Sequence, residues 1–125
     1  MHRKRYNPYE HAEQLGIRVA HQDLRAANGY WIPDHNLILL RSGMRAVHAR
    51  TVLAHEIGHA VLGHRDDRPK HESQADRFAA RNLIDLAECE AVMRATGDLY
   101  LASLELEVSQ RMLRLFLELE AVAAA

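Results

Sequence analysis

The segment His55-Glu56-Ile57-Gly58-His59 lies in a stretch with helical periodicity that ends at Gly63 and whose apolar positions are Val47, Leu53, Ile57 and Val61. On a helix, residues four apart lie on the same face, one turn apart. The imidazoles of His55 and His59 can therefore reach one ion, and a rigid turn holds them in the orientation that tetrahedral zinc needs. We predict a helix here with two zinc ligands on one face.

Glu56 directly follows the first of these ligands and is too close to His55 in sequence to bind the same ion easily. Its side chain projects to the side where a zinc-bound water would lie, which is the placement of a general base. We predict that Glu56 takes a proton from this water as it attacks a carbonyl, and then delivers the proton to the leaving amine.

A third ligand is expected from a second helix, predicted over about 71–84 after a polar loop. If this loop joins an antiparallel helix pair, Glu72 lies opposite His59, and Asp76, one turn further, lies opposite His55. Glu72 then completes a three-ligand site for one Zn²⁺ ion, and Asp76 accepts the free ring N–H of His55. A fourth position open to water is typical of catalytic zinc sites.

Three further histidines near this motif are candidates for metal binding or substrate contact. His64 comes nine residues after His55, whereas the extended metzincin pattern places its third histidine ten residues after the first, so we expect His64 off the metal. His71 points about 100° away from its neighbour Glu72, and either replaces it as a ligand or contacts substrate. His48, two turns before the first ligand, is a transition-state contact or a structural histidine, and Tyr30 is a further residue to test for substrate contact.

Working outward, the sequence predicts a short helix and a small sheet before the helix pair. Asn7-Pro8 is typical of a helix start, and Gly16 of a helix end. Short apolar runs separated by turn sequences predict three strands, over 17–20, 30–32 and 37–40. After the helix pair, helical periodicity continues with breaks at Gly97-Asp98 and near Val108-Ser109.

We therefore predict an α+β fold in which a small three-stranded sheet packs on a helical core and the C-terminal part is mostly helical. The apolar residues of the last helices indicate packing rather than a binding groove; they are Leu104, Val108, Met112, Leu115, Phe116 and Leu119. Residues 1–125 are expected to form a single domain, with 1–5 and 121–125 disordered.

The composition excludes several classes of protein. Sixteen Lys and Arg against 17 Asp and Glu give a net charge of -1, which excludes a strong polyanion binder. One cysteine leaves neither a disulfide framework nor a multi-cysteine zinc site. No stretch approaches the roughly 20 apolar residues that span a bilayer, and the basic start is not followed by the apolar run of a signal peptide. We expect a protein without membrane insertion that stays where it is made.

Two stretches resemble the ImmA/IrrE family of metallo-endopeptidases: residues 50–59, which contain His-Glu-x-x-His, and residues 72–80, which contain Glu-x-x-x-Asp. Looser similarity covers most of residues 10–119. The resemblance implies a gluzincin-like zincin core in which His55, His59 and Glu72 bind zinc and Glu56 is the base. It also implies an intracellular protease of bacterial, phage or mobile-element origin, which commonly cleaves a repressor with a helix-turn-helix domain.

We expect a zinc-dependent endopeptidase of narrow specificity, located in the cytoplasm, whose protein substrate is a transcriptional repressor. The alternative is a regulatory module that uses the metal for stability and binds a repressor or transcription factor without hydrolysis. A fourth protein ligand such as His64 or His71 would favour the module. Residues 105–120 carry four glutamates against two arginines, so we expect no direct nucleic-acid binding by the C-terminal helices.

Overall fold

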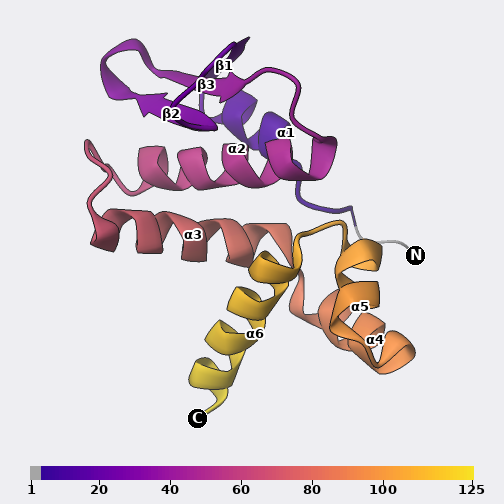
Figure 1. Ribbon diagram of the computed structural model, residues 1–125. Helices are drawn as coiled ribbons and strands as arrows, with labels where there is room; N and C mark the ends of the chain where they lie inside the picture. Colours follow the sequence, from indigo (N-terminus) through magenta and orange to yellow (C-terminus); the bar gives the residue numbers. More distant parts are fainter. Residues whose placement is uncertain (1–3) are drawn as a thin grey trace.

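The computed structural model describes residues 4–125, and the order of elements within them follows the sequence prediction (Figure 1). None of the helices in these residues combines the length and apolar character needed to cross a membrane. The elements are α1 Pro8–Gln14, β1 Arg18–Gln22, β2 Gly29–Ile32, a 3-10 turn Pro33–His35, β3 Leu37–Arg41, α2 Ala46–Val61, α3 Pro69–Leu83, α4 Leu86–Thr96, α5 Leu99–Leu106 and α6 Gln110–Ala124.

The N-terminal part forms the predicted helix and three-stranded sheet. The side chain of Asn7 accepts a hydrogen bond from the N–H of Tyr9, and Pro8 occupies the first turn of α1. In the sheet, β3 lies in the middle, parallel to β1 and antiparallel to β2. Ile38 and Leu40 of β3 are fully buried in a core shared with α2. The sheet thus covers one side of α2, with β2 as an edge strand (Figure 1).

Helix α2 lies between the sheet and α3 (Figure 1). Leu53 and Ile57 are fully buried with the sheet residues. Gly58 faces α3, where an added Cβ would lie 3.1 Å from side-chain atoms of Phe78. A residue without a side chain at this position therefore lets the two helices approach closely, as do the fully buried small residues of α3: Ala75, Ala79 and Ala80.

Two details of the helix pair differ from the prediction. The apolar stripe does not extend to Val61, which is 48% exposed because it belongs to the last turn of α2, beside the exposed residues Leu62 and Gly63. Helix α3 begins at Pro69 rather than near His71, since the fixed φ of proline suits the first helical turn. Gly63, with φ +73°, follows the end of α2 as predicted.

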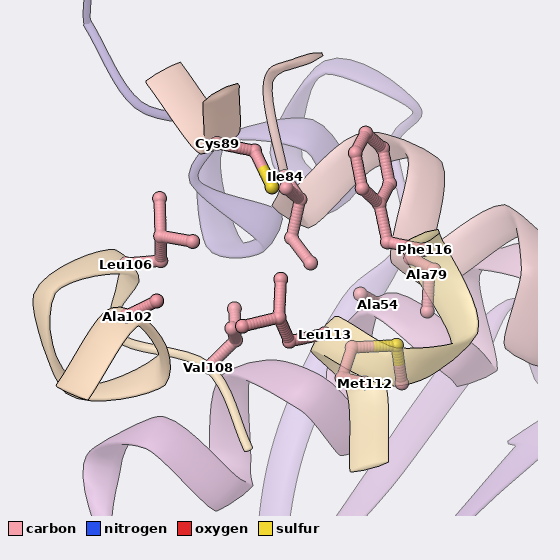
Figure 2. Close-up of a cluster of buried hydrophobic side chains, with 11 residues drawn as sticks. Ala54, Ala79, Ile84, Cys89, Ala102, Leu106, Val108, Met112, Leu113 and Phe116 are labelled. Atoms are coloured by element: carbon pink, nitrogen blue, oxygen red, sulfur yellow. The ribbon is translucent and has the colours of Figure 1, made fainter. Parts of the chain in front are cut away.

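The C-terminal helices begin at capping side chains and enclose a second core. Met112 and Leu113 of α6 are fully buried there against residues of α3, α4 and α5 (Figure 2). Cys89 points into the same core, and burial, followed by the neighbouring glutamates, raises the pKa of its thiol. The caps accept hydrogen bonds from backbone N–H groups of the first helical turns and are Asp85, Asp98 and Ser109.

Leu104 corrects the prediction that the C-terminal apolar residues all pack in the core. Its side chain is 56% exposed, because α5 turns Ala102 and Leu106 toward the core and Leu104 toward solvent. It lines a large hollow instead, which also borders Glu56. A residue assigned to packing from its spacing thus lies at the wall of the candidate site.

The structure describes most of the two end segments of the chain. Residues 121–124, for which the sequence predicts disorder, continue α6 to Ala124. Near the other end, the guanidinium of Arg5 pairs with the Glu88 carboxylate and donates to the carbonyl of Glu105. Residues 1–3, which share the prediction of disorder, lie outside the described residues.

Candidate metal centre

The first two side chains of the site come from consecutive turns of α2. His55 and His59 are four residues apart, so their rings lie on the same face, with centroids 4.8 Å apart. Their Nε2 atoms approach to 3.1 Å. Close packing of α2 on α3 at Gly58 holds this face against the second helix.

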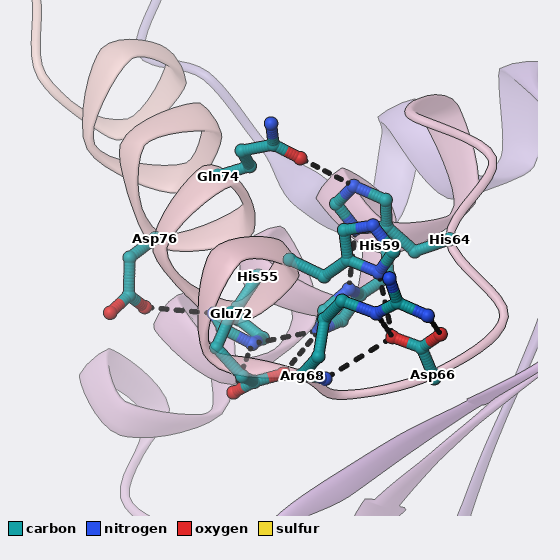
Figure 3. Close-up of polar contacts among 9 residues, drawn as sticks. His55, His59, His64, Asp66, Arg68, Glu72, Gln74 and Asp76 are labelled. Atoms are coloured by element: carbon teal, nitrogen blue, oxygen red, sulfur yellow. Dashed lines mark hydrogen bonds and ion pairs between the residues drawn. The ribbon is translucent and has the colours of Figure 1, made fainter.

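Glu72, in the first turn of α3, joins the two histidines as predicted from an antiparallel helix pair. Its Oε1 lies 2.6 Å from Nε2 of His59, and its Oε2 lies 3.2 Å from Nε2 of His55 (Figure 3). One ligand atom from each of the three residues can be chosen so that all lie within 4.8 Å of one another. The structure thus brings together the whole predicted ligand set.

Asp76 lies one turn further along α3, on the other side of the His55 ring. Its Oδ1 accepts a hydrogen bond from Nδ1 of His55 at 2.8 Å, and its Oδ2 accepts one from Nη1 of Arg111 at 3.2 Å. Burial would raise the pKa of Asp76, but the hydrogen bonds from His55 and Arg111 lower it overall. Arg111 belongs to α6, and sequence reasoning missed it because nothing local marks a contact 35 residues away.

His64 is a second neighbour that sequence reasoning missed. It does not share the ligand cluster; its Nδ1 instead lies 2.9 Å from Nδ1 of His59, on the far side of that ring. Nε2 of His64 lies 2.8 Å from the side-chain oxygen of Gln74 (Figure 3). Each of the two candidate ligands therefore has a partner on its Nδ1: a carboxylate for His55 and an imidazole for His59.

The hydrogen-bond pattern of the three converging groups suits a cation. Because Asp76 only accepts, Nδ1 of His55 carries the proton, and Nε2 of the neutral ring presents a lone pair. Burial and the nearby His55 lower the pKa of His59, which favours its neutral form as well. Burial would also lower the pKa of His55, but the hydrogen bond to Asp76 and the surrounding carboxylates raise it.

The donor set and its spacing fit a metal ion. Two imidazole nitrogens and a carboxylate are typical ligands of zinc, and atoms 2.0–2.1 Å from the metal at a tetrahedral angle are about 3.3 Å apart. The Nε2–Nε2 distance of 3.1 Å and the His55–Glu72 distance of 3.2 Å are close to this value, whereas the His59–Glu72 distance, 2.6 Å, is shorter. The residues present could therefore hold one divalent cation.

Glu56 directly follows His55 on α2 and does not share the cluster of His55, His59 and Glu72. It is 8% exposed and lines two hollows, of about 910 and 360 Å³. Burial raises the pKa of its carboxyl to about 7, with a further increase from Glu72 and opposing effects of His55 and a backbone hydrogen bond from Trp31. Gly29 of β2 lies close to this part of α2, since an added Cβ would lie 2.8 Å from Cγ1 of Val52 and in ordinary contact, at 3.4 Å, with Cγ of Glu56.

The three other predicted contact residues separate into two groups. His48 lines the larger hollow together with Leu104 and Arg111, and Tyr30 lines the smaller one. His71 borders neither: its ring stacks on His64 at 3.9 Å, and its Nδ1 lies 2.7 Å from Asp66. The structure thus places His48 and Tyr30 in hollows that Glu56 also lines, and it places His71 against His64.

Comparisons with known proteins match the same part of the chain. A family model described as the IrrE N-terminal-like domain, of a peptidase family, matches residues 12–118. The Radiation response metalloprotease IrrE of Deinococcus radiodurans is 42% identical over 52 residues. These residues are 42% of this chain but 16% of the relative, so the similarity spans about a sixth of that longer protein.

Proposed function

Since the chain belongs to the IrrE N-terminal-like domain family, we propose that it is a zinc-dependent endopeptidase of narrow specificity. The observation that carries the proposal is the convergence of His55, His59 and Glu72 beside a buried carboxyl, Glu56. The similarity to a metalloprotease supports the same activity. The metal implied by these residues is one Zn²⁺, which would be held by the three converging side chains.

The positions of His64 and His71 favour an enzyme over a metal-stabilised binding module. Both nitrogens of His64 already face partners, Nδ1 of His59 and the oxygen of Gln74. His71 faces Asp66. Within residues 4–125, the ligand cluster therefore contains three protein ligands, the number typical of catalytic zinc sites, rather than the four of structural sites.

Zinc bound here would polarise a peptide carbonyl and lower the pKa of a bound water to about 7. Glu56 would take a proton from the attacking water and return it to the leaving amine. Asp76 holds the ring of His55 in the tautomer that leaves Nε2 free. His48 and Tyr30, which border the hollows beside Glu56, are the side chains that would contact the substrate.

We propose a transcriptional repressor with a helix-turn-helix domain as the substrate, and the bacterial cytoplasm as the site of action. The support for this substrate is the resemblance of the two motifs to a family of regulatory proteases. The hollow of about 910 Å³ beside Glu56 is large enough for several side chains of a peptide segment, and it combines apolar residues such as Leu104 with the positive charges of Arg45 and Arg111.

The test incubates the purified chain, loaded with zinc or manganese, with the purified product of a neighbouring repressor gene. We expect site-specific cleavage by the wild type, which mass spectrometry of the products would locate. Glu56→Gln should keep the fold and the bound metal but lose cleavage, because the amide cannot accept the proton. Unchanged cleavage by this variant would contradict the mechanism, and binding without cleavage by the wild type would support the module instead.

A further inference from the structure

The two candidate histidine ligands are held by different chemical groups. His55 donates from Nδ1 to a carboxylate, Asp76. His59 faces the imidazole of His64, at 2.9 Å between the two Nδ1 atoms. His59 and His64 are each 6% exposed, so water has little access to replace this contact. A buried contact between two ring nitrogens needs one donor and one acceptor, because two lone pairs or two protons would repel each other.

The turn that ends α2 positions His64 over His59. Gly63 adopts φ +73°, and the N–H of His64 then donates to the carbonyl of His59 at 2.9 Å. The N–H of Gly63 donates to the carbonyl of Ala60 at 3.3 Å, which completes the pair of bonds of a Schellman motif. His59 and His64 are thus joined twice, by backbone and by side chain, and a local feature of the helix end sets the position of the second ring.

The direction of the side-chain contact follows from Gln74. Its amide oxygen only accepts, so Nε2 of His64, 2.8 Å away, carries a proton. In a neutral imidazole the other nitrogen, Nδ1, is then an acceptor. When a cation is bound between His55, His59 and Glu72, whose Oε1 lies 2.6 Å from Nε2 of His59, that Nε2 is the ligand atom, and Nδ1 of His59 donates to Nδ1 of His64.

The plane of the His64 ring is also fixed from its outer face. The ring of His71 stacks on it with an interplanar angle of 9°. Nδ1 of His71 lies 2.7 Å from Oδ1 of Asp66. Both carboxylate oxygens of Asp66 accept hydrogen bonds from the guanidinium of Arg68. A series of contacts therefore connects Asp66, in the loop between α2 and α3, through His71 and His64 to His59.

We propose that His64 and Gln74 are positioning residues of the metal centre, which hold His59 in the Nδ1–H tautomer and so present its Nε2 to the metal. The proposal rests on metal binding by His59 but does not require peptide cleavage. Partners on the outer nitrogen of a ligating histidine typically change metal affinity by about 10–100-fold. The neutral imidazole of His64 next to Nδ1 of His59 carries no charge, whereas the Asp76 carboxylate next to Nδ1 of His55 is negative. The two candidate ligands therefore differ in the charge of the group that orients them.

Zinc affinity of the full chain, measured by competition with a chromophoric chelator, gives the first test. His64→Leu removes the acceptor and should weaken binding by about 10–100-fold. His64→Asn places an amide oxygen near the position of Nδ1 and should recover affinity to within about fivefold of the wild type. His21→Asn, at an exposed position of β1, is the matched control and should leave affinity unchanged. Equal affinities of His64→Leu and wild type, or of His64→Leu and His64→Asn, would overturn the proposal.

NMR of the Nδ1–H proton of His59 in the zinc-loaded chain gives a second readout, which a purely structural role of His64 would not change. We expect a hydrogen-bonded proton that exchanges slowly with water in the wild type, and faster exchange in His64→Leu and Gln74→Met. Equal exchange rates in the wild type and in both variants would overturn the proposal. If His64→Leu fails to fold, Gln74→Met carries this test. A wild type that binds no zinc would overturn the proposed function as well, whereas a wild type that binds zinc with the same affinity as the variants would overturn this proposal alone.

Discussion

Asp76 uses both of its carboxylate oxygens, one toward His55 on α2 and one toward Arg111 on α6. The two contacts differ in environment. The ring of His55 is largely buried, whereas the side chain of Arg111 is mostly exposed. Exposed ion pairs contribute up to about 1 kcal/mol, so the bond to His55 should dominate the effect of Asp76 on the site.

This difference gives a prediction for two matched variants. Asp76→Ala should weaken zinc binding by about 10–100-fold, because His55 loses the group that fixes its tautomer. Arg111→Ala should weaken it by less than about fivefold, the most that an exposed ion pair can supply. Chelator competition measures both affinities. A larger loss in Arg111→Ala than in Asp76→Ala would show that α6, not the hydrogen bond to His55, governs the site.

Among the elements, the end of α2 has a role beyond stopping the helix. Gly63 and Gly97 both adopt a positive φ at helix ends, and at neither would an added Cβ meet another atom within 4 Å. Replacing either by alanine therefore introduces backbone strain without a steric clash. Only Gly63 precedes a residue that contacts a candidate metal ligand.

The two glycines give a controlled pair. Gly63→Ala and Gly97→Ala should each lower the free energy of unfolding of the metal-free chain by about 1–2 kcal/mol, the cost of a left-handed conformation for a residue with a Cβ. Gly63→Ala should also weaken zinc binding, because it disturbs the turn that positions His64. Urea unfolding and chelator competition measure the two effects. Equal zinc affinities of the two variants would indicate that the turn has no influence on the site.

Much of the site could be predicted at this scale, and the reasons are local. Ligands four residues apart on one helix, and a short loop to the next helix, determine which side chains of α2 and α3 face each other. The pairing of Glu72 with His59 and of Asp76 with His55 follows from these two facts alone.

What the sequence left undetermined depends on contacts between distant or irregular segments. The place of β3 in the middle of the sheet depends on which edges pair, which the strand sequences do not specify. The contact of Arg111 with Asp76 depends on how α6 packs on α3. The spacing of His64 from His55 predicts only that His64 is not a metal ligand, and it does not indicate that the turn at Gly63 directs this ring back toward His59. The spacing of residues along one helix predicts neither the strand order, nor the packing of α6 on α3, nor the position of the His64 ring.

At the scale of the whole molecule, the candidate site joins parts that belong to two separate cores. His55 and His59 lie on α2, which packs on the sheet, while Arg111 lies on α6, whose Met112 and Leu113 belong to the C-terminal core. Arg50 of α2 also donates to the backbone carbonyl of Glu107, at the turn between α5 and α6, at 2.6 Å. A metal ion held by α2 and α3 would therefore stabilise the contact on which both cores depend.

Zinc should consequently stabilise the whole fold. A ligand that binds only the folded chain at 100 times its dissociation constant adds about 2.7 kcal/mol to the free energy of unfolding. We expect a higher melting temperature with zinc, its reversal by a chelator, and no zinc-dependent change in His59→Ala. Calorimetry with and without zinc makes the comparison. An equal zinc-dependent shift in His59→Ala would place the stabilising ion elsewhere.

X-ray absorption spectroscopy of the zinc-loaded chain probes the proposed three-ligand metal centre itself. We expect one zinc per chain, bound by two imidazole nitrogens and by oxygen atoms from Glu72 and water, at distances of about 2.0–2.2 Å. Alanine substitution of His55, His59 or Glu72 should each lower the zinc content. A third imidazole in the spectrum of the wild type, or stoichiometric zinc retained after loss of any one of these side chains, would contradict it.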